Sequence, residues 1–211
     1  MPVPLPHEAN YDAVQLRASQ GRRILRTCWI SFLIVAFDVV VGTAWHEIVG
    51  HGLTAVAFGA RITYVEVVGF QLFPEIRWVG ATGYFGYCGD SGVEGDAARA
   101  LILLDGSLST WLVGVTGACL LYLRRWRGWV RILIIALSLW WLDLLLYTLP
   151  SLGIPRYLFW GHRYSEPYEA AVALGVPGHV FQSLVLMTSA VLGVTLGRNL
   201  VRRDSGCAST K

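Results

Sequence analysis

Two histidines and a glutamate stand close together at residues 46–51 (HEIVGH), inside a long apolar stretch of the chain. We interpret this segment as an HExxH-type motif, in which two histidines on one face of a helix bind a metal ion and the glutamate acts on water beside it. One zinc ion per chain is expected, because zinc lowers the pKa of a bound water to about 7. The motif predicts hydrolytic chemistry, with His46 and His51 as metal ligands and Glu47 as the general base.

A third protein ligand is expected, because catalytic zinc sites use three protein ligands and leave one position open. Asp143 is the preferred candidate, since an isolated carboxylate in the apolar stretch LWWLDLLLYTLP is costly unless it binds a cation or a proton. Asp105, in the stretch LILLDGSLST, is the alternative. A loop residue such as Glu166 or His162 is a third choice.

The apolar surroundings make the motif more specific than it is in a soluble protein. A charged side chain in the middle of a membrane helix costs about 2.5–3.5 kcal/mol on insertion scales. Three ionisable groups within six residues therefore call for a compensating partner, and a metal ion supplies one. The alternative is a polar end of a long helix, with both histidines hydrogen-bonded inside a helix bundle.

The composition favours a membrane protein. Of the 211 residues, 55% are hydrophobic and 15% are charged, against about 25% charged in an average soluble domain, and the mean hydropathy is +0.52. Four apolar stretches, at about 27–59, 97–123, 130–149 and 178–201, reach the length of about 20 residues that crosses a bilayer. We therefore expect an all-α membrane protein with about four transmembrane helices, a lipid bilayer as its surroundings and no nucleic-acid partner.

The distribution of arginine predicts the orientation of these helices. Arginines cluster before the first stretch, between the second and the third, and after the fourth. Cytoplasmic loops carry the excess of positive charge, so four helices place both termini in the cytoplasm. The predicted division is a cytoplasmic segment 1–26, a transmembrane domain 27–201 and a polar tail 202–211. The sequence makes no prediction of oligomeric state.

Residues 60–96 do not fit a membrane helix. The segment is first β-branched and aromatic with rough alternation, and then rich in glycine. This pattern predicts a short β-hairpin or irregular segment after the first helix. It is either an external loop or a re-entrant element that lines a cleft, because non-helical backbone at membrane depth is tolerated where it faces a protein cavity.

The run HEIVGHGLTAVAFGARITYVEV, followed by ATGYFGY, resembles the M50 metallopeptidases, the site-2 protease group, and within them the M50B-like branch. The resemblance covers about residues 28–150. It implies zinc binding by His46 and His51 and a general base at Glu47. The Gly-Tyr-x-Gly element makes Gly83, Tyr84 and Gly86 candidate substrate-binding residues.

The same resemblance implies an aspartate ligand on a later helix. The order of the helices favours Asp143, whereas the letters Leu-Asp-Gly favour Asp105. The expected function is a zinc-dependent intramembrane endopeptidase that acts on membrane protein substrates. The alternatives are a non-proteolytic metal-binding membrane protein, or a small proton-coupled transporter with a relay through Asp38, Asp105 and Asp143.

Overall fold

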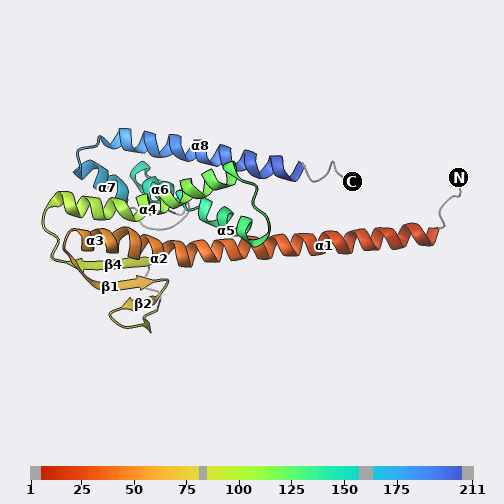
Figure 1. Ribbon diagram of the computed structural model, residues 1–211, viewed down its shortest axis with the longest axis horizontal. Helices are drawn as coiled ribbons and strands as arrows, with labels where there is room; N and C mark the ends of the chain where they lie inside the picture. The colour runs from red at the N-terminus through yellow and green to blue at the C-terminus, as the bar shows by residue number, and fades with distance from the viewer. Residues whose placement is uncertain (1–5, 81–84, 157–163, 206–211) are drawn as a thin grey trace. The chain divides into compact units, whose positions relative to one another are not determined.

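The computed structural model describes residues 6–80, 85–156 and 164–205 (Figure 1). The chain forms two units, Met1–Ala36 and Phe37–Lys211. The first unit is made by helix α1 (Pro6–Phe37), of which only Phe37 belongs to the second unit. The second unit holds the remaining helices and all the described strands, and everything below concerns this unit unless α1 is named.

In the described parts of the chain, four helical stretches are long and apolar enough to cross a membrane. They are Ser19–Ala57, Asp96–Leu123, Gly128–Leu152 and Gly178–Asn199. The prediction of a mostly helical chain with four candidate spans is confirmed, and the number and length of these helices agree with a multi-pass membrane protein. The cytoplasmic placement of both termini and the boundaries at residues 26 and 201 stay predictions.

The first stretch departs from a regular α-helix after residue 37. It continues as two π-helical segments, in which hydrogen bonds join residues five apart. Each π-helical segment is followed by a short α-helical one. The order is η1 (Asp38–Gly42), α2 (Thr43–Trp45), η2 (His46–Leu53) and α3 (Thr54–Ala57). π-Turns inside longer helices occur frequently at functional sites, and η2 carries the predicted metal motif.

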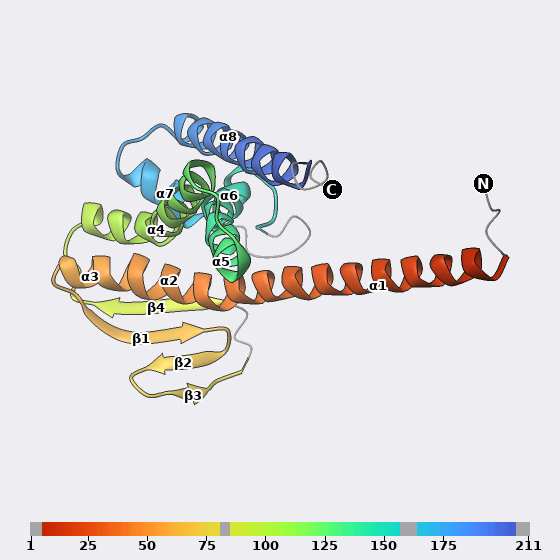
Figure 2. The ribbon, with the colours of Figure 1, turned by 45° about the vertical axis from the view of Figure 1, so that its right-hand side comes forward.

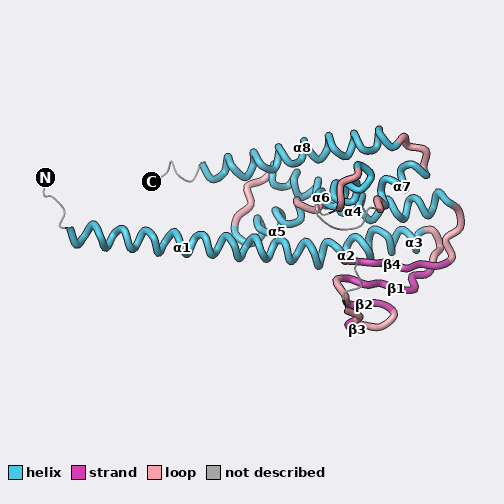
Figure 3. The backbone as a smooth tube through the Cα atoms, turned by 180° about the vertical axis from the view of Figure 1, so that it is seen from behind, coloured by secondary structure: helices cyan, strands magenta, loops and turns pink. Residues whose placement is uncertain are grey.

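The segment after this helix forms a four-stranded antiparallel sheet in the order β3-β2-β1-β4 (Figures 2 and 3). Its strands are β1 (Arg61–Val67), β2 (Phe70–Phe73), β3 (Arg77–Trp78) and β4 (Gly86–Ser91). In the register of β1 with β4, Val67 lies opposite Gly86 and Arg61 opposite Ser91. The predicted β-rich segment is confirmed, and β4 is the strand that lies next to the helix carrying the motif.

The rest of the chain surrounds helix α4. The elements are α4 (Asp96–Leu123), α5 (Gly128–Ser138), α6 (Trp141–Thr148), η3 (Leu149–Leu152), α7 (Glu166–Ala173) and α8 (Gly178–Ser205). Helix α4 contacts five of the other elements, η2, α5, α6, α7 and α8. The third predicted helix is broken between α5 and α6, and the short helix α7 lies in a stretch that was predicted as a loop.

Glycines on α4 allow neighbouring backbones to approach closely. A Cβ on Gly117 would lie 2.8 Å from the backbone nitrogen of Ser138, and a Cβ on Gly114 would lie 3.0 Å from the Cα atom of Trp141. On the facing side, a Cβ on Gly50 would lie 2.5 Å from the Cα atom of Gly106. Small residues at such crossings are typical of helix pairs in membranes, where association depends on close packing. These close approaches bring both η2 and α6 against α4, and they leave His46 of η2 within hydrogen-bonding distance of Asp143 of α6.

Candidate metal centre

The interval between His46 and His51 is five residues, one more than in HExxH. The interpretation of residues 46–51 as HExxH was therefore wrong in its spacing. In an α-helix of 3.6 residues per turn, an interval of five turns the second side chain roughly 140° away from the first. The π-helical segment η2 removes this difficulty, because its hydrogen bonds join residues five apart and bring both imidazoles to one side. The two rings thus lie together because the helix is wider at this point, and not because the spacing is that of HExxH.

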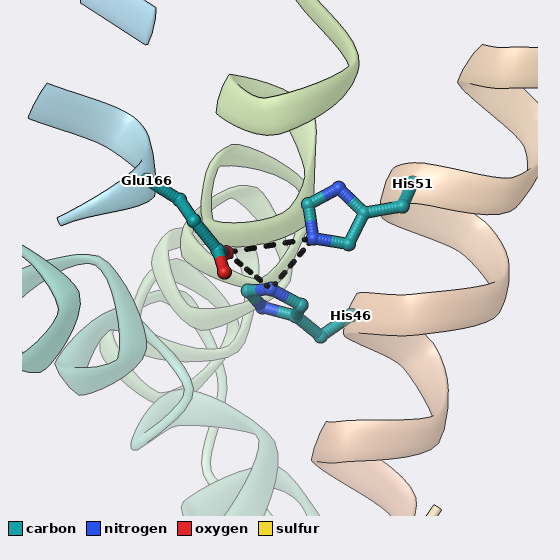
Figure 4. A group of neighbouring side chains, drawn as sticks. All are labelled: His46, His51 and Glu166. Atoms are coloured by element: carbon teal, nitrogen blue, oxygen red, sulfur yellow. Dashed lines mark hydrogen bonds and ion pairs between the residues drawn. The ribbon is translucent and has the colours of Figure 1, made fainter. Parts of the chain in front are cut away.

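The two imidazoles face each other through their Nε2 atoms, which are 3.1 Å apart (Figure 4). Their ring centroids are 4.8 Å apart and the rings are nearly perpendicular, at 77°. His46 is 3% exposed and His51 is also buried. The pair therefore lies inside the helix bundle, where an unsatisfied polar nitrogen is costly.

The carboxylate that faces both Nε2 atoms belongs to Glu166, the first residue of α7 (Figure 4). Its Oε2 atom lies 3.8 Å from Nε2 of His46 and 3.7 Å from Nε2 of His51. The three separations define a triangle whose corners are all about 2.1 Å from one common point, and zinc binds imidazole nitrogen and carboxylate oxygen at about 2.0–2.2 Å. The three atoms therefore fit the ligand sphere of one ion.

The Nδ1 atom of each ring has its own hydrogen-bond acceptor. Nδ1 of His51 donates to the carbonyl oxygen of Ile102 at 2.7 Å, and Nδ1 of His46 donates to Oδ2 of Asp143 at 2.8 Å. A carbonyl oxygen only accepts, so Nδ1 carries the hydrogen, and in a neutral imidazole the Nε2 atom then presents a lone pair. Two lone pairs 3.1 Å apart repel each other unless a cation lies between them. This tautomer is the one that metal-binding histidines with such partners adopt.

Asp143 thus contacts His46 on the side away from Glu166. Its Oδ2 atom also accepts a hydrogen bond of 2.7 Å from the Oγ1 atom of Thr110 on α4. This is the arrangement in which an outer carboxylate orients a ligand histidine and raises its basicity. In this structure Asp143 has the geometry of a positioning group, because it contacts Nδ1 of His46 and not the Nε2 atoms that face Glu166, and direct ligation by Asp143 stays a prediction. Asp105, the alternative, instead accepts a hydrogen bond from the Oγ1 atom of Thr54.

The ionisation of Glu166 suits a metal ligand. Burial raises the pKa of this carboxyl group, but its interactions with the nearby imidazoles of His46 and His51 outweigh burial and bring the pKa below its ordinary value. The group is therefore a carboxylate at neutral pH. The neighbouring thiol behaves in the opposite way: burial, assisted by the charges of Glu47 and Asp90, raises the pKa of Cys88 to about 12. Cys88 therefore stays a neutral thiol, which is not the ligand form of cysteine.

The predicted general base, Glu47, belongs to η2 and is 4% exposed. Its side chain faces the start of β4. A Cβ on Gly86 would lie 2.5 Å from the Oε1 atom of Glu47, so this position of β4 needs a glycine. Gly86 therefore lies against Glu47, and the predicted role of Gly86 in substrate binding stays a prediction. Gly83 and Tyr84, the other two members of that element, lie outside the described residues, as does His162.

The three membrane aspartates of the transporter alternative each have a different partner. Asp38 accepts a hydrogen bond of 3.1 Å from Nε1 of Trp140, while Asp105 and Asp143 contact Thr54 and His46 as described. In the parts of the chain that the structure describes, no hydrogen bond joins one of these carboxylates to another. The proton-coupled transporter alternative stays a prediction.

Gly106 on α4 provides the space that the two imidazoles occupy. A Cβ there would lie 2.6 Å from the Nε2 atoms of both His46 and His51. We expect Gly106→Ala to displace at least one ring and to lower the bound metal measured by elemental analysis of the purified protein. Gly197→Ala on α8 is the matched control, because a Cβ there meets nothing within 4 Å. A Gly106→Ala protein with the metal content of the unchanged chain would contradict this view of the site.

Comparison of the chain with protein-family models, with curated proteins and with solved structures finds no match. The resemblance to the M50 metallopeptidases therefore stays a prediction from the residues, and the argument for function depends on the geometry of the site.

Two features of the site were missed in the sequence although signals for both are present. Counting along HEIVGH shows that the two histidines are five residues apart, and not four as in HExxH. Helix α7 has Ser165 before it and Pro167 in its first turn, which is a typical helix start. Glu166 is then the acidic residue of the first turn and not a loop residue. By contrast, no local pattern indicates that Thr110 and the carbonyl of Ile102 support the two histidines.

Proposed function

We propose that this chain is a membrane-embedded zinc-dependent endopeptidase that hydrolyses peptide bonds in or near the transmembrane segments of other proteins. The observation that supports the proposal is the convergence of two Nε2 atoms and the Glu166 carboxylate on one point, with the buried carboxylate of Glu47 next to His46 in sequence. Two histidines, one glutamate and a separate acidic base form a donor set typical of zinc peptidases. We further propose that the four apolar helices are inserted in a bilayer with both termini in the cytoplasm.

His46, His51 and Glu166 would hold the ion, and Asp143 and Ile102 would fix the orientation of the two rings. A zinc ion bound there would act as a Lewis acid on a carbonyl group and would make a water molecule acidic enough to attack at neutral pH. Three ligands from the protein leave one coordination position open, as catalytic zinc requires. The Asp143 contact keeps the lone pair of His46 directed at the ion, which is the usual function of such an outer carboxylate.

Glu47 would move the proton that hydrolysis requires. Its carboxylate would accept a proton as water adds to the carbonyl carbon of the scissile peptide bond. When the carbon–nitrogen bond breaks, the same carboxyl group would donate that proton to the leaving amine nitrogen. General acid–base catalysis of this kind contributes about 10²–10⁴-fold to a rate.

Strand β4 would present the substrate to this base. Among the described strands it pairs with β1 alone, so its other edge has no strand partner. A peptide bond is cleaved in an extended segment, and an extended peptide adds readily to the edge of a sheet through main-chain hydrogen bonds. Gly86, at the start of β4, lies against Glu47 and would set the depth at which such a segment meets the catalytic carboxylate.

The proposal is tested by metal removal. The purified protein is expected to contain one zinc ion per chain by elemental analysis and to cleave at least one of a panel of doubly tagged single-span reporter proteins in nanodiscs. A chelator should reduce cleavage to background, because the proposed chemistry requires the Lewis acid, and added Zn²⁺ should restore it.

Three results would count against the proposal. Cleavage that survives complete metal removal would exclude a metallopeptidase. Stoichiometric metal without cleavage of any reporter would favour a metal-binding protein with no peptidase activity. Absence of metal, together with indifference to loss of both histidines, would exclude a metal centre altogether.

A further inference from the structure

Tyr147, on α6, contacts both elements that supply the proposed ligands. Its ring lies against the imidazole of His46, with the ring centroids 4.8 Å apart and the planes inclined by 34°. Its carbonyl oxygen accepts a hydrogen bond of 2.7 Å from the Oγ atom of Ser165, the residue immediately before Glu166. Tyr147 therefore links the ring of one ligand to the start of the helix that carries another.

Arg156 completes this connection from the other side. Its guanidinium carbon lies 3.5 Å from the centre of the Tyr147 ring, in the position of a cation over an aromatic face. Its Nη2 atom donates a hydrogen bond of 3.2 Å to the carbonyl oxygen of Tyr164, two residues before Glu166. The same arginine thus contacts the residue that packs on His46 and the segment that leads into α7.

The contacts of Arg156 indicate that its side chain has a structural role beside the site. Among the residues that the structure describes, its buried Nε atom has no hydrogen-bond partner, a cost that an arginine free to turn into solvent would avoid. The flat contact with Tyr147 and the bond to Tyr164 are the interactions that offset this cost. A lysine does not reproduce them, because an ammonium group lacks the planar face that stacks on an aromatic ring.

We propose that Arg156 is a positioning residue of the metal centre, acting on His46 through Tyr147 and on Glu166 through the carbonyl of Tyr164. This inference rests on the proposed metal centre and extends it to residues that touch none of the ligand atoms. Side chains that orient ligands in this way typically change metal affinity by 10–100-fold when they are replaced.

The test measures Co²⁺ binding by the full-length protein in detergent, by titration against a competing chelator and by visible absorption. Arg156→Ala should weaken Co²⁺ binding by about 10–100-fold and should change the absorption bands of the saturated protein, because the ligand geometry is altered. Arg156→Lys should restore only part of the affinity. Arg99→Ala, at an exposed arginine in the first turn of α4, is the control and should bind Co²⁺ with unchanged affinity and spectrum.

Variants at Tyr147 test the same connection independently and decide the matter if Arg156→Ala does not fold. Tyr147→Phe keeps the ring and the carbonyl group and should bind Co²⁺ normally, whereas Tyr147→Leu should resemble Arg156→Ala. The double variant Arg156→Ala/Tyr147→Leu should lose less than the product of the two single losses, because both changes remove one connection.

Two outcomes would overturn the inference and leave the metal centre intact. One is unchanged Co²⁺ affinity and spectrum in Arg156→Ala, and the other is Tyr147→Leu that binds like Tyr147→Phe. Failure of the unchanged protein to bind Co²⁺ at all would instead overturn the proposed metal centre, and the role of Arg156 with it.

Discussion

Replacing Glu166 by alanine is expected to cause the largest loss of metal affinity among the acidic residues of this chain. The change leaves the Nε2 atoms of His46 and His51 facing each other without the carboxylate that completes the triangle. It also removes the negative charge that balances part of the charge of the ion. Removal of a direct ligand should exceed the 10–100-fold loss that is typical of outer groups, and isothermal titration of the metal-free protein with Zn²⁺ measures it.

The matched variants are chosen to separate Glu166 from its competitors. Glu169→Ala removes an exposed carboxylate from the same short helix and should leave the affinity unchanged. Asp143→Ala removes the acceptor for Nδ1 of His46 and for the hydroxyl of Thr110, but none of the three proposed ligand atoms, and should cost about 10–100-fold. A greater loss in Asp143→Ala than in Glu166→Ala would reverse the assignment and make Asp143 the third ligand, in agreement with the order of the helices in the sequence.

The number and placement of the candidate membrane helices could be predicted because they depend on composition over about 20 residues. An apolar stretch of this length usually forms a helix that crosses the bilayer, and the charges at its ends limit where the helix begins and ends. The β-rich segment after the first helix could be predicted for a similar reason, since alternation followed by glycine does not fit a helix. These features are local, and the structure agrees with them.

The carboxylate that faces the two Nε2 atoms could not be predicted in the same way, because its position depends on contacts between distant elements. Asp143 was preferred as an isolated acid in an apolar helix, and that isolation is relieved by Nδ1 of His46 and the hydroxyl of Thr110. Both interactions satisfy a buried carboxylate as well as a metal ion does, and the sequence does not distinguish them. Glu166 was only a third choice, as a residue of a segment that was predicted to be a loop.

The extra residue between the histidines shows how tertiary contacts support an unusual local structure. A π-helical turn is rare and usually short, so local propensity does not account for η2. In this chain Gly50 packs against the backbone of Gly106, and Ile102 on the same helix accepts the hydrogen bond of His51. Helix α4 therefore holds the wide turn from one side. We infer that two features together place the imidazoles side by side. One is the interval of five residues in a π-helical turn, and the other is Gly106 on α4, which leaves room for both rings.

Replacing Glu47 by glutamine is expected to lower the rate of reporter cleavage by about 10²–10⁴-fold, the usual contribution of a general acid–base group. Glutamine has nearly the shape of glutamate, so it fits against Gly86, but it cannot accept the proton of the attacking water. Zinc content by elemental analysis should stay at one per chain, because the ligand atoms belong to other residues.

The control for this variant is Glu75→Gln, which makes the same chemical change at an exposed position between β2 and β3, where the carboxylate forms an ion pair with Arg77. It should keep both the metal and the rate. Loss of zinc along with the rate in Glu47→Gln would show that Glu47 holds the ion and does not serve only as the base. An unchanged rate with zinc still bound would remove Glu47 from the chemistry, and the buried carboxylate would then need a structural explanation in its contact with β4.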